Sequence, residues 1–228
     1  MGDLVPGVST LARADSASGR RRLGLQIVLV YASLESALWT AGIVQVVFIA
    51  LTAVLATAMT LSERRSLAKL GLDPRSIRRG WWIVPVGAAL AALTLLAAWR
   101  WHTLRLPADS PSLYRRVLLY LVWALMQQFL LQSFIFLRLE QLLRGGGRAV
   151  IAAALLFASA HIPNPVLVPV TLVGGLLLSE LFRRYRTLYL LAVAQALVAL
   201  ALAISVPETV LHDMRVGIGY ISYSAAHH

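Results

Sequence analysis

The segment from Leu23 to Leu61 reads LGLQIVLVYASLESALWTAGIVQVVFIALTAVLATAMTL, and Glu35 is its single charged residue. As one α-helix it would be about 58 Å long, nearly twice the thickness of the hydrocarbon core of a bilayer. Two spans joined by a tight turn at Thr40 to Gly42 fit that thickness. One interfacial helix followed by one span is the alternative. Either arrangement places this segment in a membrane.

The composition extends this interpretation to the whole chain. Its 228 residues are 59% hydrophobic and 14% charged, whereas a soluble domain carries about a quarter charged residues. A bilayer accepts apolar helix faces on every side, so the sequence predicts an all-α, polytopic transmembrane bundle of about seven spans, with six to eight as the range. The spans after the first segment are expected at Trp81–Trp99, within Leu113–Arg144, and at Arg148–His161, Leu167–Phe182 and Leu188–Ser205.

The chain divides into four regions on this pattern. Residues 1–22 are rich in Gly, Pro, Ser and Arg, lack a signal-peptide core, and are expected to form a disordered basic tail. Residues 23–112 hold the first helices and loops, and residues 113–205 form a second transmembrane unit. Residues 206–228 form a C-terminal tail of mixed composition.

The formal net charge is +11, and the basic residues punctuate the apolar runs as membrane-flanking loops do. The lipid bilayer is therefore the expected partner, and nucleic acid is not. All basic residues except Lys69 are arginine, which is typical of a GC-rich bacterial genome. A bacterial cytoplasmic membrane is the expected location. The chain has no cysteine, which excludes disulfides and thiolate zinc sites.

Polar side chains inside a bilayer are costly and usually face the interior of a bundle. Four glutamines and one histidine occupy such positions: Gln127, Gln128, Gln132, Gln195 and His161. They have two interpretations. The glutamines can form hydrogen bonds that join helices, and the histidine can cap a helix end. Alternatively, all five can line a functional site.

Three short motifs from Leu113 to Ser205 resemble the CAAX prenyl protease and bacteriocin-processing (CPBP) family of intramembrane proteases. That family has Glu-Glu-x-x-x-Arg on one helix, Phe-x-x-x-His on the next and His-x-x-x-Asn on a later helix. Here Gln127-Gln128-Phe-Leu-Leu-Gln132 stands at the first motif, Phe157-Ala-Ser-Ala-His161 matches the second, and Ala194-Gln195-Ala196-Leu197-Val198-Ala199 stands at the third.

The resemblance implies a glutamate that activates a water, with histidines and an asparagine that hold the water and the oxyanion. In this chain only Phe157 and His161 are retained. A neutral amide cannot take a proton from water, so Gln127 and Gln128 cannot serve as the general base. A single histidine also cannot form a zinc site, so no metal cofactor is expected. Glu35 and Glu180 are carboxylates that could substitute in principle, although no spacing points to either.

Two functions therefore remain open. The first is a protease-like protein with a degenerate site, which hydrolyses prenylated or unprenylated peptides weakly or not at all. The second is a binding or assembly factor whose old cavity holds a lipid, a prenyl group or a partner helix. A transporter ranks last, because the sequence has no internal repeat with broken helices.

The expected site combines His161 with Gln127, Gln128 and Gln195, which come from three helices. Gln132, Phe157 and Asn164 are expected to line the same cavity. Unpaired amides in hydrocarbon cost several kcal/mol, so these side chains should find polar neighbours inside the bundle.

We predict that the N-terminus and the basic linker from Ser62 to Gly80 both face the cytoplasm, because arginine and lysine concentrate on that side. Single cysteines can replace Ser18 and Ser66 in this cysteine-free chain. A membrane-impermeant thiol reagent should label neither site in intact spheroplasts and both sites after permeabilisation. Labelling of both sites from the periplasmic side contradicts this topology.

Overall fold

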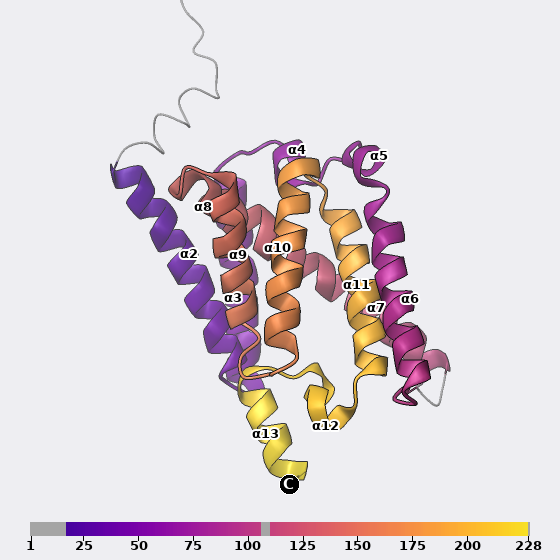
Figure 1. Cartoon of the computed structure of the whole chain (residues 1–228). Helices are drawn as coiled ribbons and strands as arrows, with labels where there is room; N and C mark the ends of the chain where they lie inside the picture. The colour runs from indigo at the N-terminus through magenta and orange to yellow at the C-terminus, as the bar shows by residue number, and fades with distance from the viewer. Residues whose placement is uncertain (1–16, 106–109, 228) are drawn as a thin grey trace, which may run out of the picture.

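The computed structural model describes residues 17–105 and 110–227, and every regular element in these ranges is a helix (Figure 1). The all-α class is confirmed. Helix α2 (Ala17–Leu38) begins inside the expected N-terminal tail, so residues 17–22 are helical and the prediction of disorder is wrong there. Residues 1–16 of that tail lie outside the described residues.

The first apolar segment forms two helices, α2 and α3 (Gly42–Ser62), as predicted. The turn falls at the expected place, and Gly42 adopts a φ of 64°, which favours glycine. Thr52 on α3 donates a hydrogen bond of 2.9 Å to the hydroxyl of Ser33 on α2. The two helices therefore form an antiparallel hairpin that is joined by polar contacts as well as by packing.

The basic linker contains two short helices, α4 (Leu67–Leu70) and α5 (Ser76–Gly80). Ser66 caps the start of α4, and Gly71 ends it with a φ of 77°. A side chain at Gly71 would meet the Phe182 ring at 2.6 Å, so only glycine lets the linker lie this close to the bundle. The next long helix is α6 (Ile83–Arg100).

The long helix predicted from about Leu113 to Arg144 is continuous but irregular. It comprises α7 (Ser110–Gln128), a π-helical segment η1 (Phe129–Phe136) and α8 (Leu137–Leu142). π-Helical turns are uncommon and often occur at functional sites. From Leu131 to Leu139 every side chain is buried, which makes this segment the centre of the core.

The remaining helices complete the bundle, and α12 and α13 lie at the end opposite to α4 and α5 (Figure 1). Their bounds are α9 (Gly146–Ser159), α10 (Leu167–Tyr185), α11 (Leu188–Ser205), α12 (Glu208–Leu211), η2 (His212–Met214) and α13 (Gly217–His227).

Four helices of the described chain are long and apolar enough to cross a membrane: α3, α6, Val117–Leu142 and α11. Helix α9 has 14 residues, about 21 Å, so it is shorter than a hydrocarbon core of roughly 30 Å. The chain is thus a multi-pass helical membrane protein, and the count of seven spans stays a prediction.

Arg138 lies inside the protein and is fully buried. Its guanidinium donates to the side chains of Gln26 at 3.0 Å and Glu63 at 2.6 Å, and it lies 3.8 Å from the centre of the Phe134 ring. These partners take the place of water around the guanidinium. The contacts fasten the α2–α3 hairpin to the central helix.

Helices α9 and α10 approach closely at one glycine of the pair Gly174 and Gly175. A Cβ atom at Gly175 would lie 2.9 Å from the Ala154 Cα atom, whereas one at Gly174 would meet nothing within 4 Å. Of the two glycines, Gly175 alone is required for this close packing.

We predict that Gly175→Ala destabilises the protein by about 1–3 kcal/mol, because the backbone of α9 must move away from the new methyl group. Gly174→Ala is the matched control. It should be neutral or gain up to about 1 kcal/mol, since alanine favours a helix over glycine. Thermal unfolding in detergent compares the two variants, and equal midpoints contradict the packing assigned to Gly175.

Candidate functional site

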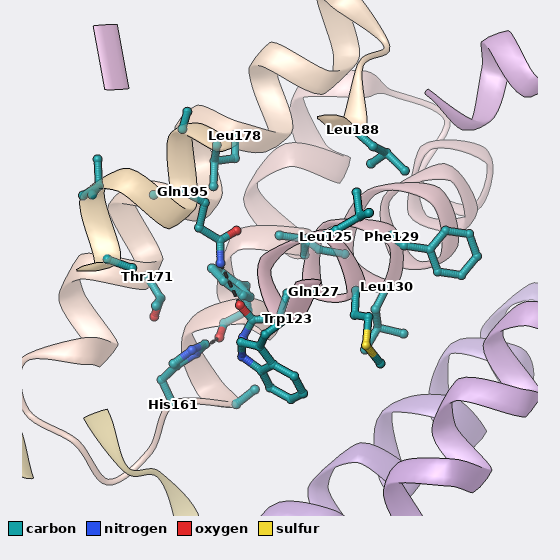
Figure 2. A pocket seen from close by; sticks show the side chains of 18 of the residues that line it. Trp123, Leu125, Gln127, Phe129, Leu130, His161, Thr171, Leu178, Leu188 and Gln195 are labelled. Carbon is teal, nitrogen blue, oxygen red and sulfur yellow. Dashed lines mark hydrogen bonds between the residues drawn. The ribbon is translucent and has the colours of Figure 1, made fainter. Parts of the chain in front are cut away.

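A cavity of about 1370 Å³ lies inside the bundle. Side chains from the first hairpin, from α6 and from the helices between α7 and α11 line it, and most of them are apolar, such as Ile49, Leu90 and Leu177. The polar residues that face it include Gln127, Gln195 and His161. Figure 2 shows these three near one another, with Trp123 and Thr171 beside them.

The four glutamines form one continuous chain of hydrogen bonds. The Nε2 atom of Gln132 donates to Gln128 Oε1 at 3.2 Å, and Gln128 Nε2 donates to Gln195 Oε1 at 2.5 Å. Gln195 Nε2 in turn donates to Gln127 Oε1 at 2.7 Å, as drawn in Figure 2. The chain joins the long central helix to α11, and every bond runs in the same direction.

Because all three bonds run in one direction, the row of glutamines has an amide donor at one end and a carbonyl acceptor at the other. At the cavity end, the Gln127 amide nitrogen has no hydrogen-bond partner among the described residues, so it can donate to a molecule in the cavity. At the inner end, Gln132 donates also to the Ser179 hydroxyl at 3.4 Å, while its Oε1 atom is buried without a partner. The geometry supports the interhelical role of the glutamines and leaves one donor for a ligand.

His161 lies in the turn that comes after α9. Its Nδ1 atom is 2.7 Å from the Phe157 carbonyl oxygen, which can only accept, so Nδ1 carries the proton. The Phe157 ring stands edge-on to the imidazole, with 4.9 Å between the ring centres. Nε2 is then the free acceptor of an imidazole whose orientation is fixed by its own helix.

The residues predicted to share the site occupy two layers. Phe157, His161, Gln127 and Gln195 face the cavity, whereas Gln128 lies behind them and is fully buried. Gln128 remains part of the cluster through its bond to Gln195. Gln132 is also fully buried behind the wall, so the expectation that its side chain lines the cavity is wrong.

Asn164 does not line the cavity either. Its Nδ2 atom donates to the backbone carbonyls of Leu211 and Arg215, and its Oδ1 atom accepts from the backbone amides of Val166 and Leu167. Both amide atoms of Asn164 are therefore hydrogen-bonded to the backbone, and these bonds join the start of α10 to the C-terminal segment. The expectation of a cavity-lining Asn164 is wrong because these local bonds hold the amide inside the protein.

Tyr31 of α2 lies beside the turn that carries His161, and the motif pattern gave no sign of it. The Tyr31 hydroxyl faces the cavity, donates to the Leu156 carbonyl at 3.1 Å and lies 2.7 Å from the Ser159 hydroxyl. Glu35 stands one turn further along α2, where its Oε2 atom accepts a hydrogen bond of 3.1 Å from Trp39 Nε1. The spacing of four residues between Tyr31 and Glu35 places them on one helix face and was the available signal.

Within the described residues, the cavity presents hydrogen-bond donors and acceptors to a ligand and does not present a metal-binding cluster. No group of three or more histidine, aspartate or glutamate side chains that could hold a metal ion occurs in residues 17–105 and 110–227. The absence of zinc from the working protein stays a prediction. A neutral amide donor at Gln127 and a neutral imidazole acceptor at His161 suit a bound carbonyl or a water molecule.

Comparison with protein families matches residues 109–201 to the family described as type II CAAX prenyl endopeptidase Rce1-like. The matched segment holds all three motif positions, from Gln127 through His161 to Gln195. The match confirms the resemblance to CAAX prenyl proteases for this part of the chain. Comparison with curated proteins gave no match, and neither did comparison with solved structures.

Proposed function

We propose that this membrane protein with an Rce1-like segment is a CAAX protease-like protein whose site is degenerate for peptide hydrolysis. It retains the cavity of the family and uses it to hold an apolar chain, such as a prenyl group or a lipid tail. Peptide bonds in the cavity are cleaved weakly or not at all. The proposed location is a bacterial cytoplasmic membrane.

The glutamine chain is the observation that carries this proposal. Gln127 and Gln128 stand where the resemblance implies glutamates, and Gln195 stands where it implies a histidine. Their amides cannot accept a proton from water, and the bonds among them occupy three of the four carbonyl oxygens in the chain. The glutamine side chains hold these positions together by hydrogen bonds, and none of them carries a charge.

Some catalytic elements remain. The free Gln127 amide can donate to a carbonyl oxygen, as an oxyanion-hole donor does. The missing carboxylate leaves hydrolysis short by about 10²–10⁴-fold, which is the typical contribution of a general base.

The distribution of charge supports the proposed orientation. The basic linker lies beside the end of α10, where the Gly71 carbonyl accepts from the Leu188 amide at 2.9 Å and Arg186 pairs with Glu140. The beginning of α2, with three consecutive arginines, lies at the same end of the bundle (Figure 1). A cytoplasmic face at this end agrees with the preference of arginine-rich segments for that side.

We predict that the double variant Gln127→Glu, Gln195→His cleaves peptides faster than the wild type, by roughly 10²-fold or more, because both positions face the cavity and the changes restore a carboxylate base and a second histidine there. Purified proteins are assayed side by side on prenylated and unprenylated peptides. Addition of His161→Ala to the double variant is the control and should abolish the gain.

Robust cleavage by the wild type that is lost in His161→Ala overturns the proposal of a degenerate site. Cleavage by the wild type that survives His161→Ala points to a contaminating protease and is excluded by a second purification.

The second candidate function is a binding or assembly factor without enzymatic activity. The size and apolar lining of the cavity favour it. Ligand cavities for small molecules usually have about 300–1,000 Å³, so 1370 Å³ accommodates a long hydrocarbon chain or part of a helix. A binding factor and a weak protease would both hold an apolar ligand in this cavity. They differ only in whether a bound peptide is cleaved.

We predict that Gly174→Leu reduces labelling by a photoreactive prenyl probe at least fivefold, because position 174 lines the cavity and has open space beyond it. Gly24→Leu is the matched control, since Gly24 also has open space but lies outside the cavity. Its labelling should equal that of the wild type. Equal labelling of both variants contradicts occupancy of the cavity by the probe.

A further inference from the structure

The polar end of the cavity brings together three polar atoms that have no hydrogen-bond partner among the described residues. Two of them are Gln127 Nε2 and His161 Nε2, whose neighbouring atoms Gln127 Oε1 and His161 Nδ1 are bonded within the protein. The third is Nε1 of Trp123, which Figure 2 shows beside Gln127 and His161. Trp123 and Gln127 are four residues apart, so they share one face of α7.

The three atoms differ in what they can do. Trp123 Nε1 and Gln127 Nε2 can only donate, whereas His161 Nε2 can only accept because Nδ1 carries the proton. Neither Gln127 Nε2 nor His161 Nε2 is among the buried polar atoms without a partner, so both are open to the cavity that their side chains line. A molecule at this end therefore meets two donor groups and one acceptor.

The polar end does not suit a charged head group. Among the described residues, the charged side chains that line the cavity are Glu180 and Arg184, and they pair with each other at 2.5 Å. Thr171 lies beside the polar end (Figure 2), and Glu180 is about 14 Å further along α10. A carboxylate or phosphate at the polar end would lose water without gaining an opposite charge, which is unfavourable. A neutral head group fits this end.

A hydroxyl group has the complementary set of bonds. Its oxygen can accept from both Gln127 and Trp123, while its proton is donated to His161 Nε2. An ether or ester oxygen accepts but cannot donate, so it leaves the imidazole unpaired. In a trans peptide group the carbonyl and the amide point in opposite directions, so one peptide group does not serve the donors and the acceptor together.

The cavity is also open toward the hydrocarbon of the membrane. Leu90 of α6 and Leu177 of α10 line it, and yet these residues are 48% and 57% exposed. Each lies near the middle of its helix. A ligand that is dissolved in the bilayer can therefore reach the polar end without passing through water.

We propose that the ligand of this cavity is a long-chain alcohol, whose apolar chain lies along the walls and whose hydroxyl binds to Gln127, Trp123 and His161. The recognised chemistry is a hydroxyl at the end of an apolar chain, which isoprenoid alcohols and diacylglycerols both have. The inference rests on the proposed function, because it takes the cavity as the binding site of an apolar chain, and it adds the identity of the head group.

Competition with the photoreactive prenyl probe, in a form that lacks a hydroxyl, tests this proposal on the full-length protein in lipid nanodiscs. The competitors are geranylgeraniol, its O-methyl ether, geranylgeranyl phosphate, dioleoylglycerol and the O-methyl ether of dioleoylglycerol. An alcohol should displace the probe at about tenfold lower concentration than its ether, because the ether leaves His161 Nε2 without a bond. A preference for the hydroxyl in either pair supports the proposal, and the pair that shows it identifies the source of the ligand.

His161→Leu assigns the preference to the imidazole. The alcohol should then bind as weakly as the ether, while the ether keeps its wild-type affinity within twofold, so the ratio between them falls from about ten to about one. The ether thereby reports on the fold of the variant within the same assay.

Trp123→Phe provides a second variant if His161→Leu does not fold. It keeps an aromatic ring and removes the indole donor, so it should weaken the alcohol and the ether alike, by about threefold. Trp81→Phe is the matched control, since Trp81 is 65% exposed and lies outside the cavity. Both ligands should bind to this control as they bind to the wild type.

The outcomes separate this inference from the proposed function. Equal competition by alcohol and ether in both pairs, with probe labelling still reduced by Gly174→Leu, overturns the inference and leaves the proposed function intact. Stronger competition by geranylgeranyl phosphate than by geranylgeraniol also overturns it, because a charged head group is then preferred. Labelling that Gly174→Leu does not reduce contradicts occupancy of the cavity, and the inference fails together with the proposed function.

Discussion

Polar groups inside a hydrocarbon environment must find partners within the protein, and this requirement organises the bundle. Arg138 meets it with a carboxylate, an amide, a backbone carbonyl and an aromatic ring. Asn164 meets it with four backbone groups. Each of these side chains joins segments that are distant in the sequence, so satisfying them also fixes the arrangement of the helices.

The same requirement bears on the proposed loss of charge at this site. A glutamate at position 128 would need a proton or a cation in this environment, whereas Gln128 both donates and accepts within the chain of amides. Replacement by glutamine therefore preserves the packing between the central helix and α11. The cost is chemical, because an amide neither binds a proton from water nor carries a negative charge.

The cavity combines an extensive apolar wall with a small polar end. The donor at Gln127 and the acceptor at His161 lie at that end, while Tyr31, which also lines the cavity, belongs to the first hairpin. The family match begins only at residue 109, so the hairpin contributes to the cavity from outside the matched segment. The surroundings of His161 consequently include Tyr31, which motif comparison within the matched segment does not reach.

The sequence by itself determined the helical membrane class, the hairpin turn at residues 40–42 and the grouping of Gln128 with Gln195. These features result from long apolar runs, from helix length against bilayer thickness and from the cost of isolated amides in lipid. The tertiary structure alone decided the burial of Arg138, the structural role of Asn164, the direction of the glutamine chain and the position of Tyr31 beside the end of α9. Those outcomes depend on contacts between helices that are far apart along the chain, and neither periodicity nor motif spacing within one helix records such contacts.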